Sequence, residues 1–173
     1  SCPEYGSLDL FCSNFAPDLT GAILFEDGPP ILFIQKRVGK GGSEFTAYKF
    51  RTIYKRFDNE MKNAGAVFAT DHRVMKAGRI LRKTAFNELP QLLNIVKGDM
   101  SFVGPRPEPP SFIASYEAEV PNIARIRYQM RPGLTGVAQV FGAHNTRPRH
   151  KLRFDLFYMR RWSFGLDLKL ISL

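Results

Sequence analysis

The sequence predicts a mixed α/β (α+β) fold in which a small antiparallel β-hairpin accompanies several helices, some of them amphipathic. Two β-rich runs, 31–38 and 44–53, are joined by a glycine-rich connection, which is typical of a hairpin. Later segments repeat apolar residues at helical spacing. With 173 residues, the chain is long enough for one compact domain with its own core.

The net charge limits the classes of partner. Lysine and arginine number 25 against 16 aspartate and glutamate residues, a net charge of +9. This excess favours nucleic acid, acidic lipid head groups or phosphorylated substrates, and charge alone does not separate the three. Cys2 and Cys12 lack metal-binding spacing, which argues against a thiolate zinc site and favours a reducing, cytosolic setting.

Residues 8–25 come nearest to a membrane-spanning run, but they are too short and too polar for one. They carry Asp9, Asn14 and Asp18 and are interrupted by Pro17. The segment also lacks the charged start and cleavage pattern of a secretory signal. We interpret it as a peripheral or buried segment, or as the remnant of something longer.

The hairpin strands are the first elements. In the second run, a period of two places Lys49 and Arg51 on the same face as Phe45 and Ala47. The two cations would then project together. This face either contacts an anion or is simply solvated.

Two helices are expected next, over 73–83 and then from Asn87 onward. Asn87 is a good N-cap residue, Pro90 suits a first turn, and Gly98 suits a helix end. The apolar stripe of the second helix comprises Leu89, Leu92, Leu93 and Val96.

The remaining elements follow from proline and glycine positions. Prolines between 105 and 110 predict an extended path, 111–118 a helix, 131–136 a turn and 137–141 a short strand. The tail, 151–173, alternates apolar and basic residues. It is either an ordinary amphipathic helix or an interfacial one, with Tyr158, Trp162 and leucines among lipid head groups and Arg153, Arg160 and Lys169 facing acidic lipids.

The stretch 82–107 concentrates chemistry suited to a diphosphate. A helix start near Asn87 would present unpaired N–H groups to phosphate, with Arg82 just upstream. Arg106 stands between two prolines, and its guanidinium matches phosphate oxygens in pairs. Glu88 is the carboxylate expected to meet a Mg²⁺ that a diphosphate brings.

Each of these features also has a simpler explanation. Asn87 can serve only as a cap, Glu88 can complement the helix dipole, and Gly104-Pro105-Arg106-Pro107 can be a structural corner. Their clustering in one short segment favours the functional interpretation.

Several ordered motifs over residues 26–170 resemble the bacterial sugar transferase family, the monotopic polyprenyl-phosphate phosphoglycosyl transferases. The resemblance rests on these segments: 28–29, 35–39, 48–52, 82–107, 131–136, 138–140 and 155–167. It implies that residues 1–25 are a shortened membrane-associating segment and that 26–173 form the catalytic domain.

The resemblance implies a two-step reaction. In the family, the Asp of an Asp-Glu pair attacks the β-phosphate of a UDP-sugar, UMP leaves, and polyprenyl (undecaprenyl) phosphate then takes the phosphosugar from the enzyme. Here the pair is Asn87 and Glu88, with Mg²⁺ as cofactor at Glu88. The residues assigned to substrate binding are Lys49, Arg51, Arg82, Arg106, Arg131 and Gln139.

The implied setting is the cytoplasmic face of a bacterial inner membrane, where such transfer primes polysaccharide or glycoconjugate synthesis. The chain would be monotopic or peripheral there, and the resemblance also allows a homo-oligomer. A nucleic-acid module using Tyr48 and Phe50 as a stacking platform is a rival. It explains neither the acid at the helix start nor the Gly-Pro-Arg-Pro corner, so we expect no nucleic-acid partner.

This chain departs from the family pattern at Asn87, because a neutral amide is a poor nucleophile. We rank three explanations: an engineered Asp→Asn change that traps substrate, a naturally inactive or altered member, and another acid such as Asp99 in the role. Asp99 ranks last because the predicted helix separates it from Asn87 by about 15 Å. A non-catalytic binder of UDP-sugar or polyprenyl phosphate is therefore the alternative function.

A second departure follows Gln139, where Val140-Phe141-Gly142-Ala143 replaces the family's usual Val-Asn-Gly-Arg. Arg147 or Arg149 can supply the missing cation, or the sugar or nucleotide contact differs. The N-terminal segment is the third departure, since the family's long hydrophobic helix is reduced here to 8–25.

Overall fold

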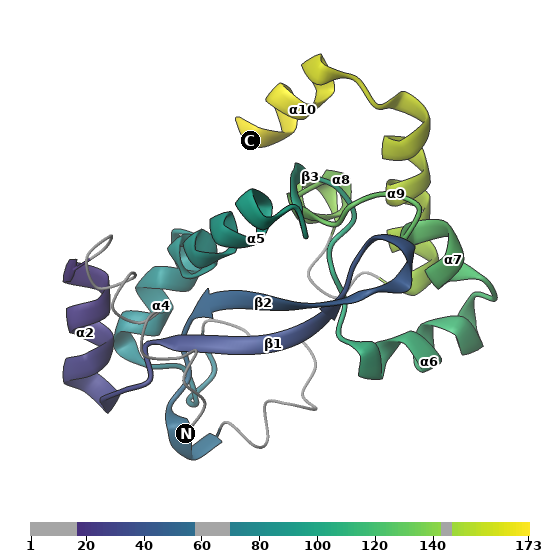
Figure 1. Cartoon of the computed structure of the whole chain (residues 1–173). Coiled ribbons are helices and arrows are strands. Elements are labelled where there is room, and N and C mark those ends of the chain that lie inside the picture. The colour runs from purple at the N-terminus through teal and green to yellow at the C-terminus, as the bar shows by residue number, and fades with distance from the viewer. Residues whose placement is uncertain (1–16, 58–69, 143–146) are drawn as a thin grey trace. The chain divides into compact units, whose positions relative to one another are not determined.

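The predicted hairpin is present, with strands β1 (Leu32–Val38) and β2 (Glu44–Phe50) paired antiparallel (Figure 1). The connection contains the short 3-10 helix η1 (Lys40–Gly42). Gly41 and Gly42 have φ values of 71° and 82°, a left-handed backbone that favours glycine. The second strand ends at Phe50, three residues earlier than the predicted run.

The structure is a computed structural model that describes residues 17–57, 70–142 and 147–173. Its described residues form two compact units. The first combines those up to Ile34 with those from Tyr48 to Leu92, and the second combines Gln35–Ala47 with Leu93–Leu173. Within the described ranges, no helix has both the length and the apolar character needed to cross a bilayer. Part of the predicted segment 8–25 lies outside these ranges.

The first unit contains two helices that pack against each other, α2 (Pro17–Asp27) and α4 (Lys76–Lys83) (Figure 1). Its apolar core is formed by Ile23, Ile31, Leu32, Phe50, Met75 and Leu81. The predicted helix from residue 73 starts later, at Lys76. The reason is that Val74 forms an antiparallel bridge with Ile53, so the backbone before Lys76 is extended. The predicted domain boundary at residue 25 falls inside α2 and stays a prediction.

The predicted N-cap role of Asn87 is wrong. Asn87 is the second residue of the 3-10 helix η3 (Phe86–Gln91), which begins after Ala85, a residue with a left-handed φ of 59°. The α-helix α5 (Leu92–Lys97) follows η3 and gives way to Gly98, whose φ of 85° fits the predicted end.

The predicted apolar stripe of this second helix is also wrong at its end. Val96 is 86% exposed, whereas Asn94 is fully buried and donates to the Thr46 carbonyl over 2.7 Å. A 3-10 helix has three residues per turn, so the preceding η3 changes which residues of α5 face inward.

The second unit contains a parallel pair of short strands, β3 (Ser101–Val103) and β4 (Gly133–Thr135). The predicted strand at 137–141 is wrong, because these residues form the helix α8 (Val137–Phe141). The strand falls on 133–135 instead, where the missing side chain of Gly133 permits close approach. A Cβ there would lie 2.0 Å from the Gly104 nitrogen.

Four further helices complete the second unit: α6 (Pro110–Glu119), α7 (Ile123–Arg127), α9 (Pro148–Arg161) and α10 (Phe164–Ile171) (Figure 1). The predicted helix 111–118 is confirmed by α6. The predicted extended path from 105 to 110 is wrong at its end, because Pro110 is the first residue of α6; residues 106–109 have no regular secondary structure. A core of Val103, Val137, Tyr158 and Leu170 joins β3, α8, α9 and α10.

The tail therefore forms two helices, α9 and α10. Trp162 and Phe164 lie at their junction and are 62% and 73% exposed, which leaves the interfacial prediction open. The interfacial alternative for the tail places Tyr158 among lipid head groups, and the structure contradicts this placement. Its ring is buried and its hydroxyl hydrogen-bonds Asp167 over 2.7 Å, so it belongs to the core.

Candidate functional site

The first unit brings a strand cation onto the acid of the predicted site. Lys49, near the end of β2, places its Nζ 2.5 Å from Oε1 of Glu88 in η3. Both side chains are about four-fifths buried, at 18% and 20% exposure. Water screens such a pair only partly, so the attraction between the Lys49 ammonium and the Glu88 carboxylate is stronger than it would be at the surface. Asn87 precedes Glu88 and is half-buried.

Arg82 belongs to the same surroundings. It lies in the last turn of α4, and its Nε donates to the Thr52 hydroxyl over 2.8 Å. Burial lowers the pKa of Arg82, and the negative charges of Asp71 and Glu88 offset this only in part. Arg82 and Glu88 thus interact electrostatically within one unit. Together with Lys49 and Asn87 they form what we call the 49–88 site.

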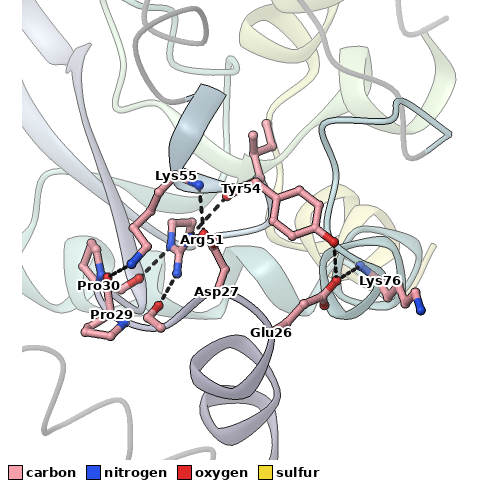
Figure 2. A network of polar contacts seen from close by, with 10 residues as sticks. Glu26, Asp27, Pro29, Pro30, Arg51, Tyr54, Lys55 and Lys76 are labelled. Carbon is pink, nitrogen blue, oxygen red and sulfur yellow. Dashed lines mark hydrogen bonds and ion pairs between the residues drawn. The ribbon is translucent and has the colours of Figure 1, made fainter.

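Arg51 has a different environment from Lys49, although a common face was predicted. β2 ends at Phe50, so the alternation of the strand does not extend to Arg51. Arg51 is 1% exposed and forms an ion pair with Asp27, which lies at the end of α2. Figure 2 shows the guanidinium among Asp27, Pro30 and neighbouring groups.

The other contacts of Arg51 are with backbone. Its Nε donates to the Pro30 carbonyl over 2.7 Å, and Nη2 donates to the Gly28 carbonyl. The side chain therefore joins the end of β2 to the turn that follows α2. Its assignment to substrate binding stays a prediction, and the contacts give it a role within the protein.

Glu26 fixes the start of α4 in the same network (Figure 2). Its carboxylate accepts from the backbone N–H groups of Lys76 and Ala77, over 2.7 and 2.9 Å, and from the Tyr54 hydroxyl over 2.8 Å. Burial acts to raise the pKa of Glu26, but these hydrogen bonds outweigh it and lower the pKa. Since α4 carries Arg82, Glu26 helps to set the position of a predicted site residue.

In the second unit, two of the predicted motifs lie side by side. The prediction of a turn over 131–136 is wrong, because residues 133–135 form β4. The corner 104–107 and the segment 131–136 share backbone hydrogen bonds from Gly104 N–H to the Thr135 carbonyl, 3.0 Å, and from Gly133 N–H to the Pro105 carbonyl, 2.9 Å. A Cβ on Gly104 would lie 2.5 Å from the Arg131 carbonyl oxygen. The glycines therefore let the two backbones touch.

Three predicted substrate-binding residues lie on these segments. Arg106 is in the corner, Arg131 is exposed with Nη2 facing Gly98, and Gln139 is in α8. The amide nitrogen and oxygen of Gln139 are both buried, and neither has a hydrogen-bond partner within the described ranges. Buried polar atoms without partners are rare, so this amide is suited to a ligand contact.

Arg106 and Gln139 belong to the second unit, and the 49–88 site belongs to the first. Their convergence on one diphosphate stays a prediction. Asp99, the alternative nucleophile, is in the second unit and accepts a hydrogen bond from Asn94 over 3.2 Å. The stacking platform considered for nucleic acid is contradicted, because Tyr48 and Phe50 are buried and cannot stack on bases.

Sequence reasoning missed a buried ionic cluster in the second unit. Arg127 in α7 donates from Nε to Asp155 in α9 over 2.6 Å, and these side chains are 2% and 3% exposed. Glu108 lies 3.8 Å from Arg127 Nη1 and 2.9 Å from Lys151 Nζ. Burial acts to lower the pKa of Arg127, but the two carboxylates outweigh it and raise the pKa. Asp155, a lone acid in a basic helix, was the available signal.

The fit for Mg²⁺ depends on Glu88. No group of three or more His, Cys, Asp and Glu side chains gathers within the described part of the chain. A cage made wholly of protein ligands is therefore not seen there. Mg²⁺ is commonly held by one or two carboxylates together with substrate phosphates, and a single carboxylate beside Lys49 and Arg82 fits that pattern.

Comparison with known proteins settles the family. A family model described as bacterial sugar transferase matches residues 8–173. The chain belongs to the bacterial sugar transferase family. The resemblance inferred from the sequence motifs is thereby confirmed.

Curated relatives of this chain are named as sugar transferases or sugar phosphotransferases. A UDP-glucose:undecaprenyl-phosphate glucose-1-phosphate transferase of Caulobacter vibrioides is 42% identical over 94% of this chain and 62% of its own length. A UDP-N-acetylgalactosamine-undecaprenyl-phosphate N-acetylgalactosaminephosphotransferase of Aeromonas hydrophila is 38% identical over 86% of this chain and 35% of its own length. The uncharacterized sugar transferase EpsL of Bacillus subtilis is 40% identical over 95% of this chain and 78% of its own length. The chain thus spans less than two thirds of the first two relatives.

Proposed function

We propose that this chain transfers a sugar 1-phosphate from a UDP-sugar to polyprenyl phosphate through a covalent phosphosugar intermediate, and so primes polysaccharide or glycoconjugate synthesis. The names of the Caulobacter and Aeromonas relatives support the reaction type. The observation that carries the proposal here is the 49–88 site, where a Lys–Glu pair and the half-buried Arg82 adjoin the position of the nucleophile.

The chemistry assigns a role to each residue of the 49–88 site. In the Asn87→Asp form, the carboxylate would attack the β-phosphorus, forming an O–P bond as the bond to the UMP oxygen breaks. A phosphate oxygen of polyprenyl phosphate would then attack the same phosphorus and free the carboxylate. In the unaltered chain an amide takes this place. Arg82 and Lys49 would stabilise the negative charge on the reacting phosphoryl group. Mg²⁺, when bound at Glu88, would supply further positive charge to the diphosphate. Lys49 contacts Glu88, so its charge lies beside the position proposed for the nucleophile.

The alternative is a family member that binds UDP-sugar or polyprenyl phosphate without turnover. Asn87 favours it, since an amide lacks the nucleophilic oxygen of a carboxylate. The site would otherwise be intact, because an amide and a carboxylate have nearly the same shape.

The test compares the unaltered chain with Asn87→Asp, using labelled UDP-glucose and polyprenyl phosphate. We expect Asn87→Asp to release UMP faster and to carry a phosphosugar adduct by intact mass. Asn87→Ala is the matched control, which removes the side chain without supplying a nucleophile. Equal turnover in the unaltered chain and Asn87→Asp would contradict the nucleophile assignment, and UMP release by the unaltered chain would contradict the non-catalytic alternative.

The proposal extends to the cytoplasmic face of a bacterial inner membrane, where UDP-sugars and the lipid carrier meet. Support comes from the exposed Trp162 and Phe164 between α9 and α10, next to Arg160 and Arg161. Aromatic and basic side chains together favour an anionic lipid surface. Sedimentation with anionic and neutral vesicles would test this, with Trp162→Ser expected to weaken binding and Gly165→Ala as control.

A further inference from the structure

The segment 104–108 has an unusual need for hydrogen-bond donors. Pro105 and Pro107 lack N–H groups, so this extended path cannot take part in a regular strand ladder. Its carbonyl groups remain acceptors, and buried carbonyls need partners. Pro105, Pro107 and Glu108 are buried. Donors from outside the segment must therefore serve these carbonyls.

Two arginine side chains supply donors to the middle of this segment. Arg127 Nη2 donates to the Arg106 carbonyl over 3.1 Å, and Arg37 Nη1 donates to the Pro107 carbonyl over 2.8 Å. Backbone N–H groups serve the two ends: Gly133 to the Pro105 carbonyl over 2.9 Å and Val38 to the Glu108 carbonyl over 3.0 Å. Four consecutive carbonyls, 105–108, are thus each held by a partner distant in sequence.

The donor on Arg127 is itself held in place. Its guanidinium is buried between Asp155 and Glu108, and Lys151 balances the second carboxylate. Two acids and two bases give the cluster no net charge. A buried arginine with such partners has little rotamer freedom, so its Nη2 stays directed at the Arg106 carbonyl.

We infer that Arg127, together with Arg37, is a positioning residue that fixes the backbone of Arg106 so that the Arg106 guanidinium meets a diphosphate in a set orientation. The diphosphate part of this inference rests on the proposed function. The ordering of the corner does not, because it concerns the protein alone. Neither arginine was assigned a role from the sequence motifs.

Lysine at position 127 separates positioning from charge. It would keep a positive charge near Asp155 but has no planar fork to reach the Arg106 carbonyl at the same time. Arg125→Lys is the matched control, since Arg125 is exposed on the same helix α7. Arg37→Met removes the hydrogen bond that Arg37 of β1 donates to the Pro107 carbonyl. This variant provides the test if Arg127→Lys does not fold.

The first experiment measures local order without ligand. Backbone ¹⁵N relaxation of the Arg106 and Glu108 amides should give order parameters of about 0.85 in the unaltered chain and in Arg125→Lys. We expect values below about 0.6 in Arg127→Lys and Arg37→Met. Unchanged order at both amides in these two variants would overturn the inference.

The second experiment measures UDP-glucose affinity in a double-mutant cycle with Arg106→Ala. We expect Arg127→Lys to weaken binding about tenfold and to weaken it no further once Arg106 is alanine, because Arg127 acts through Arg106. If Arg127→Lys and Arg106→Ala instead weakened UDP-glucose affinity independently, so that their effects multiplied in the double variant, the positioning role would be overturned. If the unaltered chain does not bind UDP-glucose, the proposed function fails together with the diphosphate part, while the relaxation data still decide whether Arg127 orders the corner.

Discussion

Replacing Arg51 with methionine tests whether this residue holds the protein together or contacts substrate. Methionine keeps most of the length and apolar volume but removes every donor. The carbonyls of Gly28 and Pro30 would then lose the Arg51 donors, and Asp27 would lose the ion pair while keeping the hydrogen bond that it accepts from the Lys55 N–H over 2.8 Å. Arg51→Lys is the intermediate variant, which keeps the charge and loses the planar fork.

The contacts set the expected size of the effect. Removing one member of a buried ion pair costs about 3–5 kcal/mol, because the other charge is left without compensation. Asp27 is 21% exposed and can recover some hydration, so we take the lower end, about 3 kcal/mol, for Arg51→Met. That is a large share of the about 5–15 kcal/mol that stabilises a typical domain. We expect Arg51→Lys to cost about half as much.

Urea unfolding followed by far-UV circular dichroism measures these free energies, with UDP-glucose affinity measured on the folded fraction. Lys36→Met, an exposed position on β1, is the control for loss of a cation. If Arg51 has a structural role, Arg51→Lys should have a lower unfolding free energy and near-normal affinity for UDP-glucose. A loss below about 1 kcal/mol with affinity reduced tenfold or more would refute the reasoning and restore Arg51 as a substrate ligand.

For three further perturbations, the contacts determine whether stability or affinity rises or falls. Glu26 has a lowered pKa, so its stabilisation is present above its ordinary pKa of 4.5 and is lost as pH falls through the lowered value. The stability gap between the unaltered chain and Glu26→Gln, about 1 kcal/mol at neutral pH for this solvent-screened group, should therefore shrink toward pH 3 in urea titrations. Gly133→Ala should lower Tm by the equivalent of about 2–3 kcal/mol, because the added Cβ would lie 2.0 Å from the Gly104 backbone nitrogen. Gly165→Ala is the control and should raise Tm slightly, because no atom lies within 4 Å of its added Cβ. Lys49→Met should weaken UDP-glucose binding about tenfold in calorimetry. It should also lower the unfolding free energy, because it removes the Lys49 charge from the four-fifths buried Glu88 carboxylate. Unchanged affinity would remove Lys49 from the site.

Local signals in the sequence were enough for the hairpin and for several helices. The glycine-rich connection predicted the turn between β1 and β2, where Gly41 and Gly42 adopt left-handed backbone. Gly98 likewise predicted the end of α5. In each case the deciding physics lies within a few residues, because a left-handed φ is costly for any side chain but glycine.

Non-local contacts defeated the other predictions. The strand β4 has three residues and exists because Gly133 can approach Gly104, far away in sequence. The run 137–141, rich in apolar and β-branched residues, looked more like a strand but forms α8. Propensity is a weak guide when the pairing partner is unknown.

The candidate site divides in the same way. Glu88 and Arg82 could be named from the sequence, since they lie six residues apart in one charged stretch. The pairing of Glu88 with Lys49 spans 39 residues and needs the fold to be seen. The ionic cluster around Arg127 is equally non-local, and nothing in the spacing of its members marks them as partners.

Two arginines in this chain have the same kind of partner, which bears on how basic motifs should be interpreted. Arg51 donates to carbonyls of the turn at 28–30, and Arg127 donates to a carbonyl of the corner at 104–108. Both segments contain two prolines, whose missing N–H groups keep the segments out of a regular strand ladder. In each segment, a buried arginine thus donates hydrogen bonds to backbone carbonyls of the protein itself, without any ligand. Lys49, which forms an ion pair with Glu88 of the 49–88 site, has the stronger claim to act on a phosphate, because its charge lies beside the position proposed for the nucleophile.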